Sequence, residues 1–405
     1  MRRGENVEAE MDILIAEDDN SARSLLSTYL KRWGHHVIEV ADGEQAWQYL
    51  QHHPVHFVIS DWLMPRVDGL ELCRLIRAAN FQHYTYIILL TAKNGKDEII
   101  HGMESGADDF VTKPFNASEL NARIRAGERI INLEKKLEDR NSRLSAANAI
   151  IRKDLEAAAE LQKSLLPDAT ASLNGLTFQS LFLPCTYVAG DIFNFFQLDD
   201  RHIGFYLLDV AGHGIPAAML SVTLSKMLAT NVLDLNGFKN GNEYETLLSP
   251  ARRVGELNKQ FHSNDDSMRH FTMLYGMVDT QRNTVKVTQA GHPPPIVMNA
   301  RVVAPLPTNG GFPVGLLPEM DYEEMEFDFN PGDRLIVYSD GVTECRNPKD
   351  EQYSLKRLIR RLQGLKNRPL PDVLNRLKFS LNSWRGRPDF DDDISVLAIE
   401  RADIK

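Results

Sequence analysis

A long segment without Gly or Pro, between Gly127 and Pro167, most constrains how this chain folds. Gly and Pro both disfavour helix interiors, and their absence allows one helix to continue through residues 128–166. At 1.5 Å per residue, such a helix is roughly 50–60 Å long. The sequence patterns before and after it differ, so we expect two domains, at 11–127 and 167–405, joined by this helix.

The joining helix carries an apolar residue at every seventh position. These positions are Ile130, Leu137, Leu144, Ile151, Ala158 and Leu165. A repeat of this length places them on one side of the helix and favours a coiled coil, hence a homodimer. The companion stripe is incomplete, because Arg140 and Asp154 interrupt it. A single helix that packs on the chain's own domains is therefore the alternative.

Residues 11–127 alternate short apolar runs with segments of helical spacing. The runs are DILIAED, HVIEVA, FVISD, YIILLTA and DFVTK. Each is typical of a buried parallel strand, and five such units predict a doubly wound α/β domain with a five-stranded parallel sheet. Ligands of such a domain lie at the carboxyl ends of its strands.

Polar residues stand at those strand ends. They are Asp18, Asp19, Asp61, Thr91 and Lys113. Three carboxylates at one edge of a sheet repel one another unless a cation joins them, and a hard divalent ion such as Mg²⁺ suits oxygen ligands. A lysine and a hydroxyl group opposite suit an incoming phosphoryl group, which Asp61 can accept as a nucleophile.

The stretches AEDD, SDWLMPRVDG, LLTA and DFVTKPF resemble the motifs of a response regulator receiver domain. The resemblance implies that a histidine kinase phosphorylates Asp61. The Mg²⁺ ligands that it implies are Asp18, Asp19, Asp61 and the carbonyl group of Leu63. The phosphoryl contacts and the switching aromatic residue that it implies are Thr91, Lys113 and Phe110.

Residues 167–405 mix short β-like runs with longer helical segments, which predicts an α+β domain large enough for its own core. Acidic residues stand beside the β-like runs. They are Asp191, Asp209, Asp340 and the triplet 391–393. Each one alone is typical of a turn, so the prediction depends on the set. Clustered carboxylates without His or Cys suit Mg²⁺ or Mn²⁺, and two such ions can activate a water against a phosphate ester.

The same residues lie in motifs that resemble the PPM-type, metal-dependent serine/threonine phosphatases of the SpoIIE/RsbU-like bacterial branch. The matching stretches include VAGDIFNFF, LLDVAGHGIPAAML, QAGHPPPIV, YSDGVTECRN and DDDISVLAI. The resemblance implies two packed sheets flanked by helices. It also implies a catalytic core of Asp209, Asp340 and Asp392, in which Asp209 bridges two ions.

The resemblance implies two further metal contacts, Asp191 and the carbonyl group of Val210. Asp392 is preferred within its triplet, because the family's ligand stands two residues before the isoleucine of DDIS. His213 and His292 are interpreted as residues that shape loops. Asn194 stands where the family usually has a second acidic residue, and this departure bears on an outer metal contact or on the phosphate pocket.

Together the two resemblances predict a response regulator of a two-component system, in which phosphorylation of Asp61 controls a protein serine/threonine phosphatase. The family implies a phosphorylated STAS-domain anti-sigma-factor antagonist as the substrate, in a partner-switching pathway. The alternative is a non-catalytic adaptor that uses the same fold to bind a sigma factor or another protein. The presence of Asp209, Asp340 and Asp392 favours the enzyme.

Charge and composition narrow the partners. The formal net charge is −10, and no helix-turn-helix follows the first domain, so we expect no nucleic-acid partner. No apolar run approaches the ~20 residues of a membrane span, and MRRGENVEAE lacks the apolar segment of a secretory signal. The three cysteines form no CxxC pair, which is typical of buried thiols in a reducing cytosol. We therefore expect a cytoplasmic protein without a membrane anchor.

Overall fold

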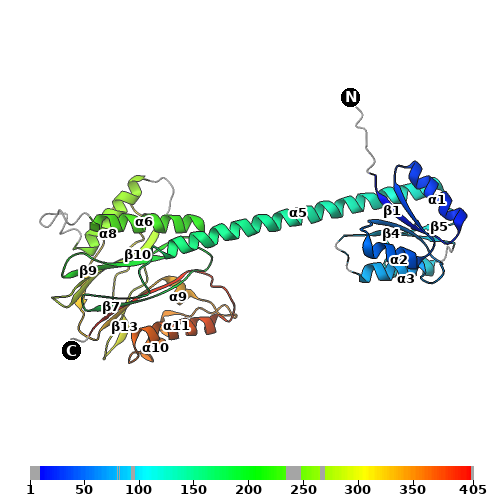
Figure 1. Ribbon diagram of the computed structural model, residues 1–405. Coiled ribbons are helices and arrows are strands. Elements are labelled where there is room, and N and C mark those ends of the chain that lie inside the picture. Colours follow the sequence, from blue (N-terminus) through cyan, green and yellow to red (C-terminus); the bar gives the residue numbers. More distant parts are fainter. Residues whose placement is uncertain are drawn as a thin grey trace. The chain divides into compact units, whose positions relative to one another are not determined.

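The computed structural model describes residues 10–79, 81, 83–92, 96–233, 248–264 and 270–402. The chain forms two compact units, Met1–Ala149 and Ile150–Lys405. Helix α5 (Ala117–Lys163) contributes residues to both units (Figure 1).

The first unit is a parallel sheet with the strand order β2-β1-β3-β4-β5, which confirms the predicted doubly wound α/β architecture. Its strands are β1 (Asp12–Ala16), β2 (His36–Val40), β3 (Phe57–Asp61), β4 (Tyr86–Thr91) and β5 (Asp109–Thr112). Its helices are α1 (Asn20–Arg32), α2 (Gly43–His52), α3 (Gly69–Ala78), α4 (Lys96–Glu104) and the first part of α5.

Strand β1 shows why helices cover both faces of this sheet. Successive side chains of a strand point to opposite faces. Ile13 and Ile15 pack with α1 and α5, whereas Leu14 and Ala16 pack with α2 and α3. All four side chains are fully buried. The sheet therefore lies between two helical layers, and its strand ends are left open for polar residues.

The second unit contains two antiparallel sheets, with the orders β14-β11-β10-β9-β8 and β13-β12-β15-β16-β7-β6. The strands of the first are β8 (Ile192–Gln197), β9 (His202–Val210), β10 (Phe271–Asp279), β11 (Thr284–Ala290) and β14 (Met325–Asp328). Those of the second are β6 (Thr170–Leu173), β7 (Leu176–Leu183), β12 (Ile296–Met298), β13 (Val303–Pro305), β15 (Arg334–Tyr338) and β16 (Ile394–Arg401). The helices are α6 (Ile215–Leu233), α8 (Pro250–Asn264), α9 (Asp340–Glu344), α10 (Leu355–Gln363) and α11 (Leu370–Arg385).

The two sheets pack face to face, with helices on the outside of each (Figure 1). Phe205 of β9 and Val337 of β15 lie in the core between the sheets. Tyr206, the next residue of β9, faces the core formed with α6 and α8. Ile336 of β15 faces the core formed with α10 and α11. This four-layer arrangement confirms the predicted fold of two packed sheets flanked by helices.

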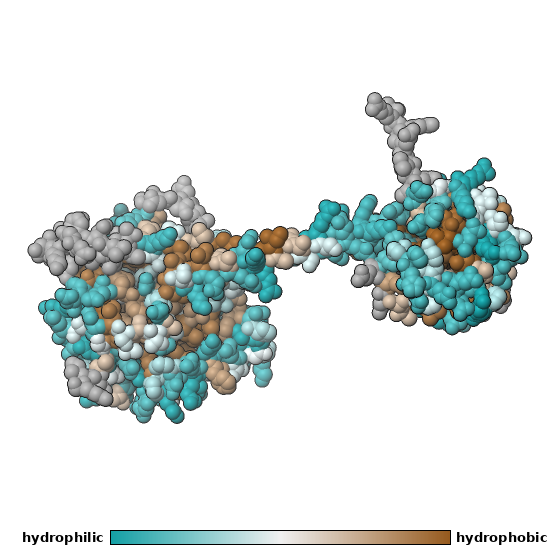
Figure 2. All heavy atoms as spheres, viewed as in Figure 1, coloured by the Kyte–Doolittle hydropathy of each residue, from teal (hydrophilic) through white to brown (hydrophobic). Residues whose placement is uncertain are grey.

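Helix α5 contains most of the helix predicted for residues 128–166, but it begins earlier, at Ala117, and ends at Lys163. Apolar residues along its middle and its end are exposed to solvent, and Figure 2 shows such residues on the helix surface. They include Leu133, Leu137, Leu144, Ile151 and Leu161, each more than half exposed. The domain limits drawn from the sequence stay predictions. Among the described residues, no helix is both long and apolar enough to span a membrane.

The core between the two sheets provides a test of stability. Phe205 is fully buried, and its ring lies against Gly276 on the neighbouring strand. Because glycine has no side chain, it cannot fill the cavity that loss of the ring would leave. We expect Phe205→Ala to lower the free energy of unfolding of the second unit by about 3–5 kcal/mol. Hydrogen exchange of the β9 and β10 amides measures this change. Phe379→Ala is the matched control, because Phe379 is 70% exposed.

Candidate functional site

Five aspartates gather at one edge of the two-sheet sandwich. They are Asp191, Asp209, Asp340, Asp392 and Asp393, which stand beside strands β8, β9, β15 and β16. Antiparallel pairing places the start of β8 beside the end of β9, and the end of β15 beside the start of β16. The structure therefore brings together the four acidic positions that the sequence predicted, together with Asp393.

Burial and mutual repulsion make these carboxylates difficult to ionise together. Burial, together with the charges of Asp340, Asp392 and Asp393, raises the pKa of Asp209 to about 8. Burial and the same kind of repulsion raise the pKa of Asp392 to about 6. Burial also raises the pKa of Asp340 and, with the nearby charge of Asp209, moves the pKa of Asp191 well above its usual range.

Asp191 provides an independent sign that the cluster accommodates a cation. Its side chain is only 1% exposed, and neither carboxylate oxygen has a hydrogen bond of good geometry among the described residues, although the nearby Ser339 and Ser395 hydroxyl groups act to lower its pKa. A buried polar group without a partner is costly, and a divalent cation with oxygen ligands would remove that cost. The residues present therefore fit Mg²⁺ or Mn²⁺.

Glycines allow the chain to approach this edge closely. Gly212 and Gly214 have φ values of +94° and +82°, which residues with a side chain rarely adopt. They turn the chain directly after Asp209. A Cβ atom at Gly190 would lie 3.0 Å from the carbonyl oxygen of Val210, and one at Gly341 would lie 2.1 Å from that of Asp393. Side chains at these positions would force the acidic segments apart.

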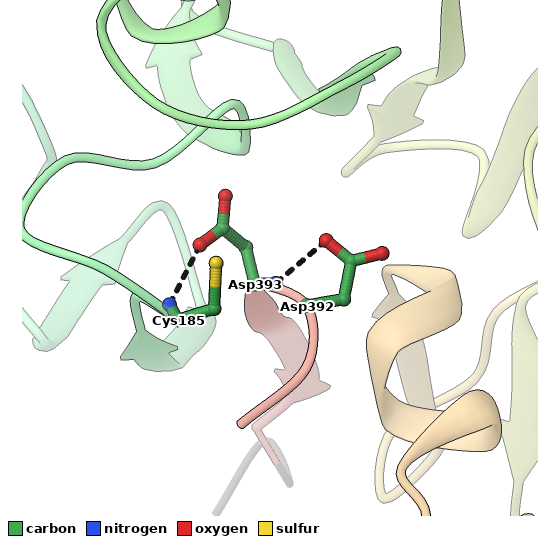
Figure 3. A group of neighbouring side chains, drawn as sticks. All are labelled: Cys185, Asp392 and Asp393. Atoms are coloured by element: carbon green, nitrogen blue, oxygen red, sulfur yellow. Dashed lines mark hydrogen bonds between the residues drawn. The ribbon is translucent and has the colours of Figure 1, made fainter. Parts of the chain in front are cut away.

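The structure gives each member of the 391–393 triplet a different role. Asp391 forms an ion pair with Arg387. Asp393 is buried and accepts hydrogen bonds from the backbone amides of Cys185, at 2.8 Å, and Gly190, at 2.7 Å. Among the described residues, Asp392 accepts from the amide of Asp393, at 2.8 Å, and its second oxygen is turned away from Asp393 (Figure 3). This arrangement agrees with the choice of Asp392 as the ligand.

The sequence pattern includes Asp393 in the acidic triplet but gives it no role of its own. Its two hydrogen bonds hold the loop of residues 184–190, which leads into Asp191. The only signal in the sequence was the length of the acidic run, and this did not distinguish a ligand from a residue that positions a loop.

Helix α5 holds the same loop from its other side. The side-chain amide of Gln162 donates to the carbonyl oxygen of Ala189, at 2.7 Å, and its oxygen accepts from the Ala189 amide, at 2.9 Å. Gln162 is 4% exposed, so water does not compete for these bonds. The last turns of α5 therefore contact the residues that position Asp191.

A groove of about 590 Å³ lies beside the acidic cluster. Its lining is mainly apolar and includes Leu155, Pro184, Cys185, Val188 and Ile215. The Cys185 thiol lies within 4.8 Å of ligand atoms of Asp392 and Asp393, so the groove reaches the carboxylates. This geometry leaves space beside the cluster for part of a larger substrate.

Among the described residues, the close group of potential metal ligands in the second unit is Cys185, Asp392 and Asp393. It includes neither His213 nor His292, and the other three aspartates of the cluster also lie outside it. His292 is buried, and its Nδ1 lies 2.9 Å from the hydroxyl group of Thr272, the residue opposite Asp209. Burial lowers the pKa of His292 to about 3, so its ring is neutral. His213 is exposed in the turn after Asp209. Asn194, on β8, lies opposite Tyr206 of β9, and its side-chain oxygen accepts a hydrogen bond from the Phe195 amide.

The first unit contains a separate acidic cluster. Ligand atoms of Glu17, Asp18 and Asp61 lie within 4.8 Å of one another. The Lys113 ammonium lies 2.7 Å from a Glu17 oxygen and 3.0 Å from Asp61 Oδ1. Burial acts to lower the pKa of Lys113, but its hydrogen bonds to Glu17 and Asp61 raise it overall. A permanent positive charge therefore stands beside Asp61.

This cluster differs from the expected one in a single member. Asp19 was expected to join Asp18, but it caps helix α1, where its Oδ1 accepts from the Ala22 amide at 2.7 Å. Glu17 occupies the place beside Asp61 and is 1% exposed. The physical reason is that β1 ends at Ala16, so Glu17 still follows the direction of the sheet, whereas Asp19 already begins the helix.

The remaining predicted residues of the first unit lie on strands β4 and β5 and in the loop after β3. Thr91 ends strand β4 and is buried. Phe110 is half-buried on β5, with the Arg123 guanidinium 5.9 Å from the centre of its ring. The Leu63 side chain is 64% exposed in the loop after Asp61. The roles given to these residues stay predictions.

Two family models match the chain, and they cover separate parts of it. The model described as Stage II sporulation protein E (SpoIIE) matches residues 199–402. The model described as a response regulator receiver domain matches residues 13–125.

Individual relatives repeat this division. The phosphoserine phosphatase RsbP of Bacillus subtilis (strain 168) is 24% identical over 253 residues, which are 62% of this chain and 58% of RsbP. The response regulator GtcR of Aneurinibacillus migulanus is 44% identical over 114 residues, 28% of this chain and 46% of GtcR. The chain thus spans about half the length of the curated relatives that it matches.

A solved structure supports the fold of the second unit. The SiaA-PP2C domain of Pseudomonas aeruginosa superimposes with a TM-score of 0.55 and 21% sequence identity. The match covers 64% of this chain and all of that domain. The likeness shows that the second unit has the fold of a PP2C domain.

The raised pKa of Asp209 predicts a stability that depends on pH. A carboxyl group whose pKa is higher in the folded protein stabilises the fold fully below its ordinary pKa, and this contribution is lost as the pH rises through the folded value of about 8. In metal-free protein at pH 8.5 we therefore expect Asp209→Asn to be more stable than wild type, by roughly 2 kcal/mol.

Urea unfolding in the presence of EDTA measures this difference, which should shrink as the pH falls towards 4. Asp391→Asn is the control, because Asp391 lies on the surface beside Arg387. Equal stabilities of Asp209→Asn and wild type at pH 8.5 would contradict the repulsion argued here.

Proposed function

The chain belongs to the SpoIIE family and carries a response regulator receiver domain, and we propose that it is a receiver-controlled, metal-dependent protein serine/threonine phosphatase. The observation that carries the proposal is the cluster of buried carboxylates around Asp209, whose burial and mutual repulsion raise the pKa values of Asp191 and Asp209. Such a cluster is costly in itself and becomes favourable once cations bind.

Each residue has a distinct task in the proposed site. Asp209, Asp340 and Asp392 would hold two Mn²⁺ or Mg²⁺ ions, with Asp191 and the Val210 carbonyl group as further contacts. When bound, these ions supply a low-pKa water and neutralise the charge of a phosphate ester. Asp393 holds the 184–190 loop in place through the amides of Cys185 and Gly190. The neighbouring groove excludes water from one side of the substrate.

The substrate is proposed from the relatives. RsbP is named a phosphoserine phosphatase, which supports a phosphorylated serine or threonine of a protein as the group removed. We propose a STAS-domain anti-sigma-factor antagonist as that protein, in a cytoplasmic partner-switching pathway. The alternative, a non-catalytic adaptor that binds a sigma factor or another protein, has less support because Asp191, Asp209, Asp340 and Asp392 are all present and gather together, and Asn194 is the departure that favours it.

Hydrolysis of p-nitrophenyl phosphate by the full chain tests the enzyme. We expect activity that requires Mn²⁺ and is reduced at least ~100-fold by Asp392→Asn, because one ligand is lost. Asp391→Asn is the matched control and should keep wild-type activity, since Asp391 pairs with Arg387 outside the cluster. Metal binding by a folded wild-type chain without any hydrolysis, of this ester or of phosphoserine peptides, would favour the adaptor.

Control of the phosphatase would start at the receiver. We propose that a histidine kinase phosphorylates Asp61 with Mg²⁺ bound at Glu17, Asp18 and Asp61, and that Lys113 contacts the phosphoryl group. A change in α5 would then reach the second cluster through the two hydrogen bonds of Gln162 to Ala189. This coupling needs a conformational change in the receiver that biases the helix.

The exposed apolar stripe of α5 supports a homodimer through a coiled coil. We expect the wild-type chain to sediment as a dimer and Leu144→Asp, at a central position of the stripe, to weaken dimerisation at least ~10-fold. Lys153→Asp on the same helix is the control. Beryllofluoride, which mimics an acyl phosphate, should change the dimerisation of wild type but not that of Asp61→Asn. A monomer at micromolar concentration, with and without beryllofluoride, would rule the dimer out.

A further inference from the structure

Positive charge is concentrated in one part of a chain that is acidic as a whole. The formal net charge of the chain is −10, yet the segment 355–385, which forms α10 and α11, contains nine Lys or Arg residues and a single Asp, Asp372. Such segregation creates a local positive potential that extends about one Debye length from the surface.

Part of this charge lines a groove of about 480 Å³ between the two helices. We call it the arginine groove, and its residues are Arg357, Arg360, Arg361, Ser380, Ser383 and Trp384. Arg357 lies over the Trp384 ring, 3.8 Å from its centre, so its guanidinium is held by an aromatic face. Hydroxyl groups and ordered guanidinium groups in a concave surface are suited to bind carboxylate groups.

The arginines of this groove have no acidic partners within the described part of the chain. Arginines just outside the segment do: Arg346 pairs with Asp350, and Arg387 pairs with Asp391. Arg361 instead donates to the carbonyl oxygen of Arg376, at 3.1 Å, and its Nε is buried without a hydrogen-bond partner. The groove therefore carries positive charge that the protein itself does not neutralise.

The arginine groove is linked to the acidic cluster through a short path. The Trp384 indole donates to the carbonyl oxygen of Cys345, at 3.1 Å. Cys345 caps α9, whose first residue is Asp340, and a helix of this length spans only about 7 Å. Trp384, which lines the groove, is therefore only a short segment away from Asp340 of the cluster.

We infer that the arginine groove is a docking site for an acidic segment of the phosphoprotein on which the cluster acts. This inference rests on the proposed phosphatase function and adds the charge of its partner. The carboxylates of the cluster repel an acidic phosphoprotein until cations bind, and the nearby positive groove offsets this repulsion and orients the partner.

Two other anionic partners fit the groove less well. A membrane surface is flat, and a membrane-bound helix needs a row of exposed apolar residues, whereas Phe379 is the single large hydrophobic residue among those described in 355–385 that is strongly exposed. A nucleic acid strand would extend past the groove over a chain with a net charge of −10.

Fluorescence anisotropy with a labelled peptide of Asp and Glu residues, and with the same peptide in Asn and Gln, tests the docking site on the full chain. We expect Arg357→Gln/Arg360→Gln to weaken binding of the acidic peptide about tenfold and to remove its salt dependence. Lys259→Gln/Arg282→Gln removes the same charge from exposed positions elsewhere and should leave binding unchanged. Circular dichroism checks that both variants fold.

Reversal of the charge in the arginine groove provides a second test of the docking site. Arg357→Glu/Arg360→Glu should lose the acidic peptide and gain a peptide of Lys residues. Equal binding of the acidic peptide by wild type and Arg357→Gln/Arg360→Gln would overturn the inference. It would also be overturned if vesicles containing phosphatidylglycerol, or a single-stranded RNA, bound through these arginines while the acidic peptide did not.

Hydrolysis of p-nitrophenyl phosphate by the wild-type chain separates this inference from the proposed function. A chain that hydrolyses the ester but binds the acidic peptide without using the groove keeps the phosphatase and rejects the docking site. A chain that binds the peptide through the groove but shows no metal-dependent hydrolysis keeps an acidic partner and rejects its role as a phosphatase substrate.

Discussion

The mutual repulsion of buried carboxylates is the constraint on which the second unit depends. Asp191, Asp209, Asp340 and Asp392 come from segments that are far apart in the sequence, and no cationic side chain among the described residues is placed to neutralise them by an ion pair. A flexible chain would move such groups apart. The two packed sheets prevent this, because the strand ends that carry the aspartates are fixed by cross-strand hydrogen bonds and by three apolar cores.

The two clusters of the chain handle acidic charge in different ways. In the first unit, Lys113 stands between Glu17 and Asp61 and neutralises part of their charge within the protein. In the second unit, backbone amides donate to both oxygens of Asp393 and to one oxygen of Asp392, and the proposed cations would neutralise the cluster. The first arrangement suits a site that is built before it is modified, and the second suits a site whose assembly depends on its cofactors.

Sequence patterns predicted the elements well, because buried strands and long helices leave strong periodic signals. They also predicted Asp209 and Asp340, since aspartate is disfavoured in strands and each of these two lies at the end of an apolar run, before a glycine-containing segment. Neighbouring acidic residues were harder: Glu17 and Asp19, or Asp392 and Asp393, differ by one or two positions in the sequence. Which one faces the cluster depends on where the strand ends and which backbone amides lie nearby, and these are tertiary facts.

Gln162 shows what the continuity of α5 implies for signalling. One side-chain amide makes both bonds to Ala189, so the two bonds form or break together. A rotation of α5 about its own axis that moved this side chain away from Ala189 would break both bonds at once. We therefore expect the rotational orientation of α5 about its own axis to determine whether the loop before Asp191 is held. The loop would then have two states, held and released, and would not respond in a graded way.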